Sequence, residues 1–192
     1  MSSLRWVFGY GSLMWDPGFR VIESVTARLD GFARSFCLRS TRYRGTEAAP
    51  GLVLGLDEDP AAHCTGIALR FADEDREAVL DYLRERELVT YAYREAILPV
   101  TLSDGRQVEA LTYVMQRDHV QYAGNLAPCE QARIISDAHG QRGPNSDYLF
   151  NTTRHLAQIG LSDAQLDKLS EDVRRLIAAR GRNGPPSDRK DG

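Results

Sequence analysis

Apolar residues in the first two thirds of the chain form short runs and alternations that are typical of β-strands. Between Val21 and Leu29 apolar and polar positions alternate, which indicates a strand with one buried face. The same pattern predicts further strands, which are Trp6–Tyr10, Phe32–Leu38, Leu52–Leu56, Cys64–Phe71, Tyr91–Leu102 and Val108–Gln116. We expect Asp57-Glu58-Asp59-Pro60 to end one of these strands, and Ser103-Asp104-Gly105-Arg106 to form a hairpin turn.

Helices are predicted where apolar residues recur every three to four positions. One such segment lies between the strands, where Val79, Tyr82, Leu83 and Arg86 share a face and Asp73 can cap the start. The last third of the chain predicts three more helices. The first begins at Pro128 and ends before Gly140, and the second begins at Asn145 and ends at Gly160. The third begins with the capping box Ser162-Asp163-Ala164-Gln165 and ends at Gly181. Strands first and helices last favour the α+β class, as a small closed or half-closed β-barrel with helices packed around it.

Composition and charge then narrow the class of protein. The chain has 192 residues, so we expect a single domain over residues 1–180 and a disordered tail over the Gly-, Pro- and charge-rich residues 181–192. A net charge of −3 argues against a nucleic-acid partner, and the absence of a long apolar run argues against a membrane span. Three cysteines without CxxC spacing favour reduced thiols in a cytoplasmic protein, and the four histidines lack the spacing of a metal site.

The most unusual segment is Val7-Phe8-Gly9-Tyr10-Gly11-Ser12-Leu13-Met14-Trp15, in which two glycines end an apolar strand. Glycine permits positive φ and close approach of a ligand, so consecutive N–H groups here can form a nest for a carboxylate or phosphate. A tight turn that binds nothing explains the same pattern equally well. A dinucleotide fingerprint is excluded because Met14 stands where a third glycine is required, and a nucleophile elbow because Ser12 follows Gly11 directly.

Glu87 is the last acidic residue before an apolar stretch, at a predicted helix-to-strand junction. If its side chain points into a pocket, loss of solvent raises its pKa above the ~4.3 of a free glutamate. The alternative is a solvated helix end formed by Arg84, Glu85, Arg86 and Glu87, which spacing alone favours. Residue type and spacing leave both interpretations open.

Together these segments resemble the ChaC family of γ-glutamylcyclotransferases, most closely its bacterial branch. The motifs that carry the resemblance follow the family's order over nearly the whole chain: Val7–Trp15, Ala49–Leu56, Cys64–Ala68, Arg86–Thr90 and Gly143–Thr152. The resemblance departs shortly after the glutamate, where some members have a glycine and this chain has Tyr91. We expect the ring of Tyr91 to lie beside the site, where it would narrow the pocket or reorient the strand.

The resemblance implies a γ-glutamylcyclotransferase-like mixed β-barrel with peripheral helices. It also implies a lyase that degrades glutathione to 5-oxoproline and Cys-Gly without cofactor or metal. A cyclotransferase for other γ-glutamyl peptides or amines, or a non-catalytic γ-glutamyl-binding module, are the alternatives. We expect the substrate to be the only partner of the site, with no nucleic acid and no membrane, and the oligomeric state is left open.

The resemblance also assigns roles to residues of this chain. Glu87 matches the catalytic acid/base, and Glu95 is the fallback if the alignment slips. The residues matched to substrate binding are Tyr10, Gly11, Ser12, Leu13 and, less closely, Tyr148. Three arginines of a polar loop, Arg39, Arg42 and Arg44, either meet the glycine carboxylate of glutathione or form a solvated basic loop.

Overall fold

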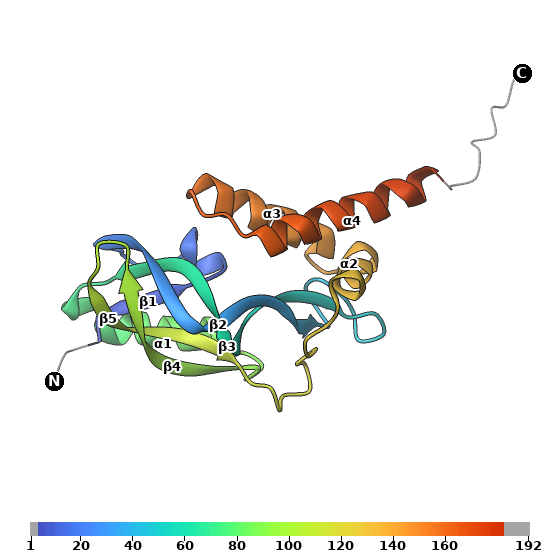
Figure 1. Ribbon diagram of the computed structural model, residues 1–192. Helices are drawn as coiled ribbons and strands as arrows, with labels where there is room; N and C mark the ends of the chain where they lie inside the picture. The colour runs from blue at the N-terminus through green and yellow to red at the C-terminus, as the bar shows by residue number, and fades with distance from the viewer. Residues whose placement is uncertain (1–3, 183–192) are drawn as a thin grey trace, which may run out of the picture.

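A closed barrel of five strands, in the order β1-β3-β2-β4-β5, forms the centre of the computed structural model, which describes residues 4–182 (Figure 1). The strands are β1 (Trp6–Gly9), β2 (Glu23–Ser40), β3 (Gly51–Arg70), β4 (Tyr93–Leu102) and β5 (Gln107–Met115). Neighbouring strands are antiparallel except β1 and β5, whose parallel pairing closes the barrel. The predicted α+β class and the closed barrel are therefore confirmed.

Two strands are much longer than the hydrophobic pattern predicts. β2 has 18 residues and runs through the break expected between Leu29 and Phe32. β3 has 20 residues and runs through the turn expected at residues 57–60, so that prediction is wrong. The register gives the reason: Asp30 pairs with His63 and Phe32 with Glu58, so the extra residues of β3 form a bulge inside a continuing ladder.

The helices surround this barrel on two sides. Their bounds are α1 (Arg76–Glu87), α2 (Pro128–Asp137), α3 (Asn145–Gln158) and α4 (Ala164–Arg182), with short elements η1 (Ser12–Met14), η2 (Asp73–Asp75), β6 (His139–Gly140) and β7 (Gly143–Pro144). Figure 1 shows α2, α3 and α4 as one layer over the long β2–β3 hairpin, and α1 lies against the barrel away from that layer. All four predicted helices are present, and none of the described helices is both long and apolar enough to cross a membrane.

The predicted start of α3 differs from the structure. Asn145 is not the cap of α3, because the N-cap is Pro144 and Asn145 is the first helical residue. Its side chain instead bonds both backbone groups of Leu52 on β3, which ties the start of α3 to the barrel.

Predicted ends of the other helices also differ. The side chain that caps α4 is Asp163, which accepts a bond from the Leu166 N–H at 3.1 Å, rather than Ser162. Asp73 belongs to η2 and forms an ion pair with Arg5 instead of capping α1. Gly181 lies inside α4, so the expected disordered tail overlaps a helix at residues 181–182, and residues 183–192 lie outside the described part of the chain.

β1 is buried on both faces, and this explains its unbroken apolar sequence. Trp6 and Phe8 point into the barrel core, whereas Val7 packs outward with Val79 and Leu83 of α1. The helical layer buries a separate apolar cluster against the outer face of β2 and β3. The end of β1 therefore lies where the barrel, α1 and the helical layer meet.

Candidate active site

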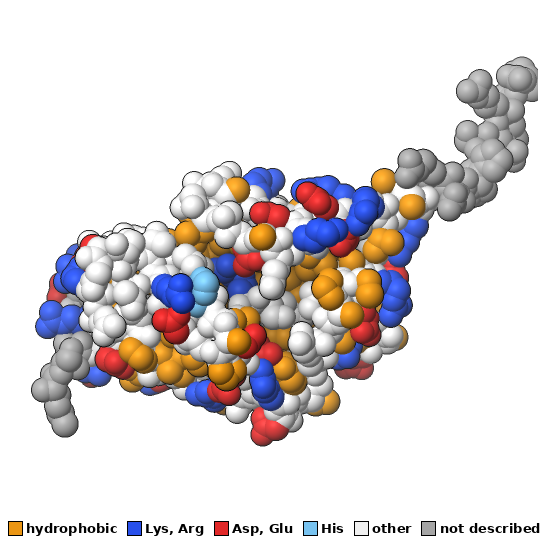
Figure 2. All heavy atoms as spheres, viewed as in Figure 1, with side chains coloured by type: hydrophobic (Ala, Val, Ile, Leu, Met, Phe, Trp, Pro, Cys, Tyr) orange, Lys and Arg blue, Asp and Glu red, His pale blue; other side chains and the backbone are white. Residues whose placement is uncertain are grey.

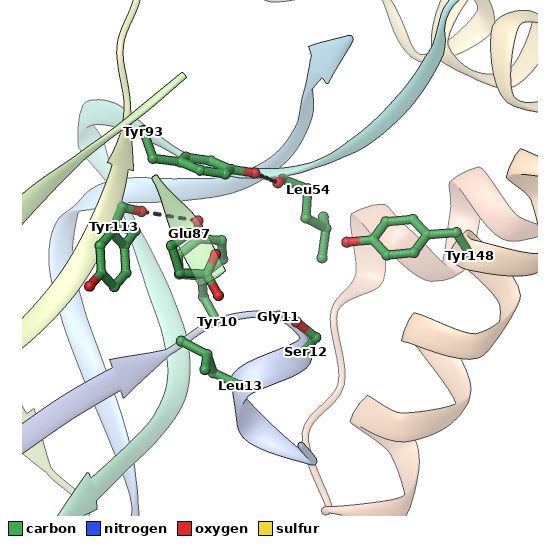
Figure 3. Close-up of a pocket in the computed structure, with 9 residues that line it drawn as sticks. All are labelled: Tyr10, Gly11, Ser12, Leu13, Leu54, Glu87, Tyr93, Tyr113 and Tyr148. Carbon is green, nitrogen blue, oxygen red and sulfur yellow. Dashed lines mark hydrogen bonds between the residues drawn. The ribbon is translucent and has the colours of Figure 1, made fainter. Parts of the chain in front are cut away.

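A pocket lies at the end of β1, and nine residues line it, seven on six helices or strands and two in the link between β1 and η1 (Figure 3). The lining residues are Tyr10, Gly11, Ser12, Leu13, Leu54, Glu87, Tyr93, Tyr113 and Tyr148. All six residues that the sequence assigned to the site are among them. Figure 2 shows that the surface is hollowed between the helical layer and the barrel.

Glu87 reaches the pocket because of its place on α1. Val79, Leu83 and Glu87 are spaced four residues apart, so they share one face of the helix. The first two are buried against the barrel, and Glu87, one turn further, extends past them. Its side chain is 18% exposed, whereas Glu85 on another face is exposed to solvent. The structure thus favours a Glu87 that faces the pocket over a solvated helix end.

Burial and a neighbouring cation act on the Glu87 carboxyl in opposite directions. Loss of solvent raises the pKa of Glu87, and Arg86 opposes that rise. Arg86 Nε lies 3.1 Å from Glu87 Oε1, and another guanidinium nitrogen donates to the Ser12 hydroxyl at 3.0 Å. Burial dominates, so the Glu87 carboxyl holds a proton more readily than a free glutamate does.

The segment after β1 folds back at once into the single turn of η1. A Cβ on Gly9 would lie 3.2 Å from both Leu13 Cβ and Met14 N, so any other side chain would crowd this reversal. The expected positive φ is not found, because neither Gly9 nor Gly11 has one. The first backbone bond of the turn runs from Met14 N to Gly11 O, so the N–H groups of Ser12 and Leu13 precede it.

Four tyrosines line the pocket together with Glu87. The Tyr93 hydroxyl donates to Leu54 O at 2.6 Å and the Tyr10 hydroxyl to Tyr113 O at 3.0 Å (Figure 3). Burial raises the pKa of Tyr10 and Tyr93 far above the ordinary value and that of Tyr148 to about 12. The phenols therefore stay protonated at neutral pH.

Three lining residues, Leu54, Tyr93 and Tyr113, were missed by the sequence analysis. Leu54 lies on β3 within the Ala49–Leu56 motif, to which no role in the site was assigned, whereas Tyr93 and Tyr113 lie on β4 and β5, where no motif marks them. Tyr93 and Met115 are partners in the β4–β5 register, which brings Tyr93 and Tyr113 to the same end of the barrel. Only the register of the closed barrel could have identified these two tyrosines.

Other residues considered in the sequence lie outside the pocket lining. Glu95 is held by Arg84, whose Nε and another nitrogen donate to its two oxygens at 3.0 and 3.1 Å. The side chain of Tyr91 is 70% exposed, so the expectation that its ring narrows the pocket is wrong. Tyr91 instead has a left-handed backbone, with φ of 54°.

Of the three loop arginines, Arg44 lies nearest the pocket. Its guanidinium carbon lies 5.7 Å from the ring centre of Tyr148. One nitrogen also donates to the carbonyl oxygens of Arg142 and Pro144. Arg42 packs against Tyr43 and donates to Gln141, away from the lining residues.

No metal or thiol chemistry is built into the described pocket. Within residues 4–182, no group of three or more His, Cys, Asp or Glu side chains is arranged to hold a metal ion. Burial raises the pKa of Cys37 to about 12 and that of Cys64 to about 11, which makes both thiols poor nucleophiles. The one carboxylate among the nine lining residues is Glu87.

Comparison with known proteins assigns the chain to a family. A family profile described as ChaC-like protein matches residues 5–176. The chain belongs to the ChaC family. Within that family, the glutathione-specific γ-glutamylcyclotransferase of Escherichia coli (strain K12) is 39% identical over 173 residues, which cover 90% of this chain and 74% of that protein.

A second curated protein and a crystal structure support the same family. A protein of Schizosaccharomyces pombe (strain 972 / ATCC 24843) with the same name is 31% identical to this chain. The match covers 90% of this chain and 93% of that protein. A crystal structure of a yeast γ-glutamylcyclotransferase specific to glutathione superposes with a TM-score of 0.79 at 27% identity, covering 91% of this chain and all of that one. The ChaC resemblance drawn from the sequence is therefore confirmed.

Proposed function

We propose that this ChaC protein is a glutathione-specific γ-glutamylcyclotransferase that releases 5-oxoproline and Cys-Gly. The observation that carries the proposal is the desolvated carboxyl of Glu87, which lies in one pocket with the Tyr10–Leu13 segment. The names of its relatives from Escherichia coli and Schizosaccharomyces pombe supply the substrate.

The reaction needs no nucleophile from the protein. The α-amine of the γ-glutamyl group attacks its own γ-carbonyl carbon, a new C–N bond closes the five-membered lactam, and the bond to the cysteine nitrogen breaks. Because nucleophile and electrophile belong to one molecule, orientation alone supplies much of the rate, with effective molarities of ~10⁵ M or more for aligned groups. The attacking amine must lose a proton and the leaving nitrogen must gain one.

Glu87 can perform both proton transfers. Its carboxylate accepts the proton that the attacking amine gives up and then delivers it to the departing nitrogen. A free peptide amine has a pKa of ~8, so a base with a raised pKa suits this transfer better than an exposed glutamate. Burial raises the pKa of Glu87 in the required direction.

The rest of the pocket would hold the substrate. We expect the N–H groups of Gly11, Ser12 and Leu13, which are all lining residues, to bind either the α-carboxylate or the developing oxyanion. The hydroxyls of Tyr10 and Tyr148 add neutral contacts. Arg44 lies against the ring of Tyr148, and it is the loop arginine that we expect to meet the glycine carboxylate.

The remaining expectations belong to the same proposal. We propose that residues 1–180 act as one domain, in the cytoplasm, on a small-molecule substrate, without nucleic acid, membrane or metal. These statements rest on composition and on the ChaC resemblance, and they stay predictions.

The test is a paired assay of 5-oxoproline release from glutathione without added metal. The wild-type protein is compared with Glu87→Gln and with Glu95→Gln, a matched carboxyl outside the pocket lining. We expect release by the wild type and Glu95→Gln, and loss in Glu87→Gln. Release from other γ-glutamyl amines but not glutathione would support the broader cyclotransferase, and binding without any release would support the binding module.

A further inference from the structure

Arg34 is a buried cation that the mechanism above does not use. It lies on β2, and its guanidinium side chain is 5% exposed. Its contact with Asp163, just before α4, shows that the side chain lies on the strand face that meets the helical layer. Burying a guanidinium is costly unless several partners compensate, so its contacts indicate what it does.

The contacts of Arg34 join three separate parts of the fold. Nε donates to Tyr10 O at 2.6 Å, and one terminal nitrogen donates to Thr65 O at 2.6 Å. The other terminal nitrogen lies 3.0 Å from an oxygen of Asp163, which also caps α4. The planar guanidinium suits this task because its donors point in fixed, different directions.

The two carbonyl groups show why a donor is needed at this place. β1 pairs with β3 as far as Gly9 and Ile67, and beyond that pair the two strands separate. Continued pairing would have brought Tyr10 and Gly11 beside Gly66 and Thr65. Arg34 instead bonds the Tyr10 and Thr65 carbonyls, and so occupies the gap where the ladder opens.

We propose that Arg34, held by Asp163, is a positioning residue that fixes the Tyr10–Leu13 segment for substrate binding. The inference rests on the proposed cyclotransferase function. Arg34 fixes the first peptide of the segment at its carbonyl, so the direction of the following N–H groups depends on this contact. A misplacement of about 1 Å at such a site can cost ~100-fold in rate.

The proposal also connects the helical layer to the site. Asp163 lies at the start of α4, so the ion pair ties this helix to the site segment through one side chain. Replacing Arg34 alone by a hydrophobic residue would leave the Tyr10 and Thr65 carbonyls and Asp163 without their donor, so the contact also contributes to stability. The test therefore has to separate positioning of the site segment from stability of the fold.

The test uses two variants and a control. Arg34→Lys keeps the charge but loses the planar set of donors. Asp163→Asn keeps a good helix cap but removes the negative partner, and it covers the case in which Arg34→Lys does not fold. The control is Arg106→Gln. Arg106 lies just before β5, at the end of the barrel opposite the site, and forms ion pairs with Glu23 and Asp104 that this substitution breaks.

Two readouts are measured at a temperature where each variant is folded. We expect kcat/KM for glutathione to fall ~10–100-fold in Arg34→Lys and about tenfold in Asp163→Asn, with Arg106→Gln within about twofold of wild type. Hydrogen exchange of the amides of residues 10–15 should quicken about tenfold in both variants, with the β4–β5 hairpin unchanged. A larger KM would indicate that the segment binds the α-carboxylate, and a smaller kcat that it binds the oxyanion; either supports positioning.

Two results would overturn the positioning role of Arg34. If both variants keep kcat/KM within threefold of wild type, or if exchange quickens evenly over the barrel, Arg34 is merely structural and the proposal is overturned. If the wild type itself releases no 5-oxoproline, the proposed function fails, and the exchange at residues 10–15 then decides the role of Arg34 alone.

Discussion

Asn145 carries the clearest energetic prediction of this structure. Its side-chain oxygen accepts the Leu52 N–H at 2.6 Å, and its side-chain nitrogen donates to Leu52 O at 2.7 Å. Both residues have no exposed surface. In Asn145→Ala, two buried backbone groups of Leu52 lose their partner.

The magnitude follows from these two bonds. A buried polar group left unsatisfied costs about 1–3 kcal/mol, and alanine returns about 0.5 kcal/mol of helix propensity. Asn145→Ala should therefore lower the free energy of unfolding by about 2–5 kcal/mol. In a chain of this size each kcal/mol moves Tm by about 2–4 °C, so we expect a drop of roughly 4–20 °C.

Chemical and thermal unfolding followed by circular dichroism measure this change. Asn151→Ala is the matched control on the same helix, because its side chain bonds Arg154 within one turn and is only partly buried. It should change the unfolding free energy by less than about 0.5 kcal/mol. A loss below about 1 kcal/mol in Asn145→Ala, or an equal loss in both variants, would refute the reasoning.

Two further predictions concern pH and backbone strain. Burial raises the pKa of Glu87, so the acid limb of the kcat/KM profile should lie above pH 4.5. Arg86→Gln should move this limb to higher pH, because the cation that opposes the rise in pKa is lost. An acid limb at or below pH 4.5 in the wild type would contradict this. Tyr91 has φ of 54° and an exposed ring, so Tyr91→Gly should keep activity and raise the unfolding free energy by up to about 1 kcal/mol. Denaturant unfolding that shows a clear loss of stability would count against this view of Tyr91.

The hydrophobic pattern predicts the class and the barrel, but not the length of its strands. The turn residues at positions 57–60 predict the end of a strand, which is wrong, because β3 continues and β2 pairs with it on both sides of the bulge. Pairing partners far apart in the chain decided this, and no local window contains them. The same limit explains Asn145, whose local pattern predicts a cap but whose side chain is used by Leu52 of β3.

The site was predictable to the extent that it rests on contiguous motifs. The segment Tyr10–Leu13 and Glu87 stand out in the sequence, and the pocket brings them together. Arg34 did not stand out, because a single arginine in an apolar strand carries no motif. Its importance appears only when the Tyr10 and Thr65 carbonyls and Asp163 are seen around it.

The most direct test of the central claim is the release of 5-oxoproline from glutathione by wild type and Glu87→Gln, without added metal. Because burial raises the pKa of Glu87, the ionised carboxylate opposes folding above pH 4.5, so Glu87→Gln should fold at least as stably at neutral pH. We expect release by the wild type and a fall of at least ~10²–10⁴-fold in the folded variant. Equal release by both proteins would contradict the assignment of Glu87 as the acid/base, and no release by the wild type would contradict the proposed reaction.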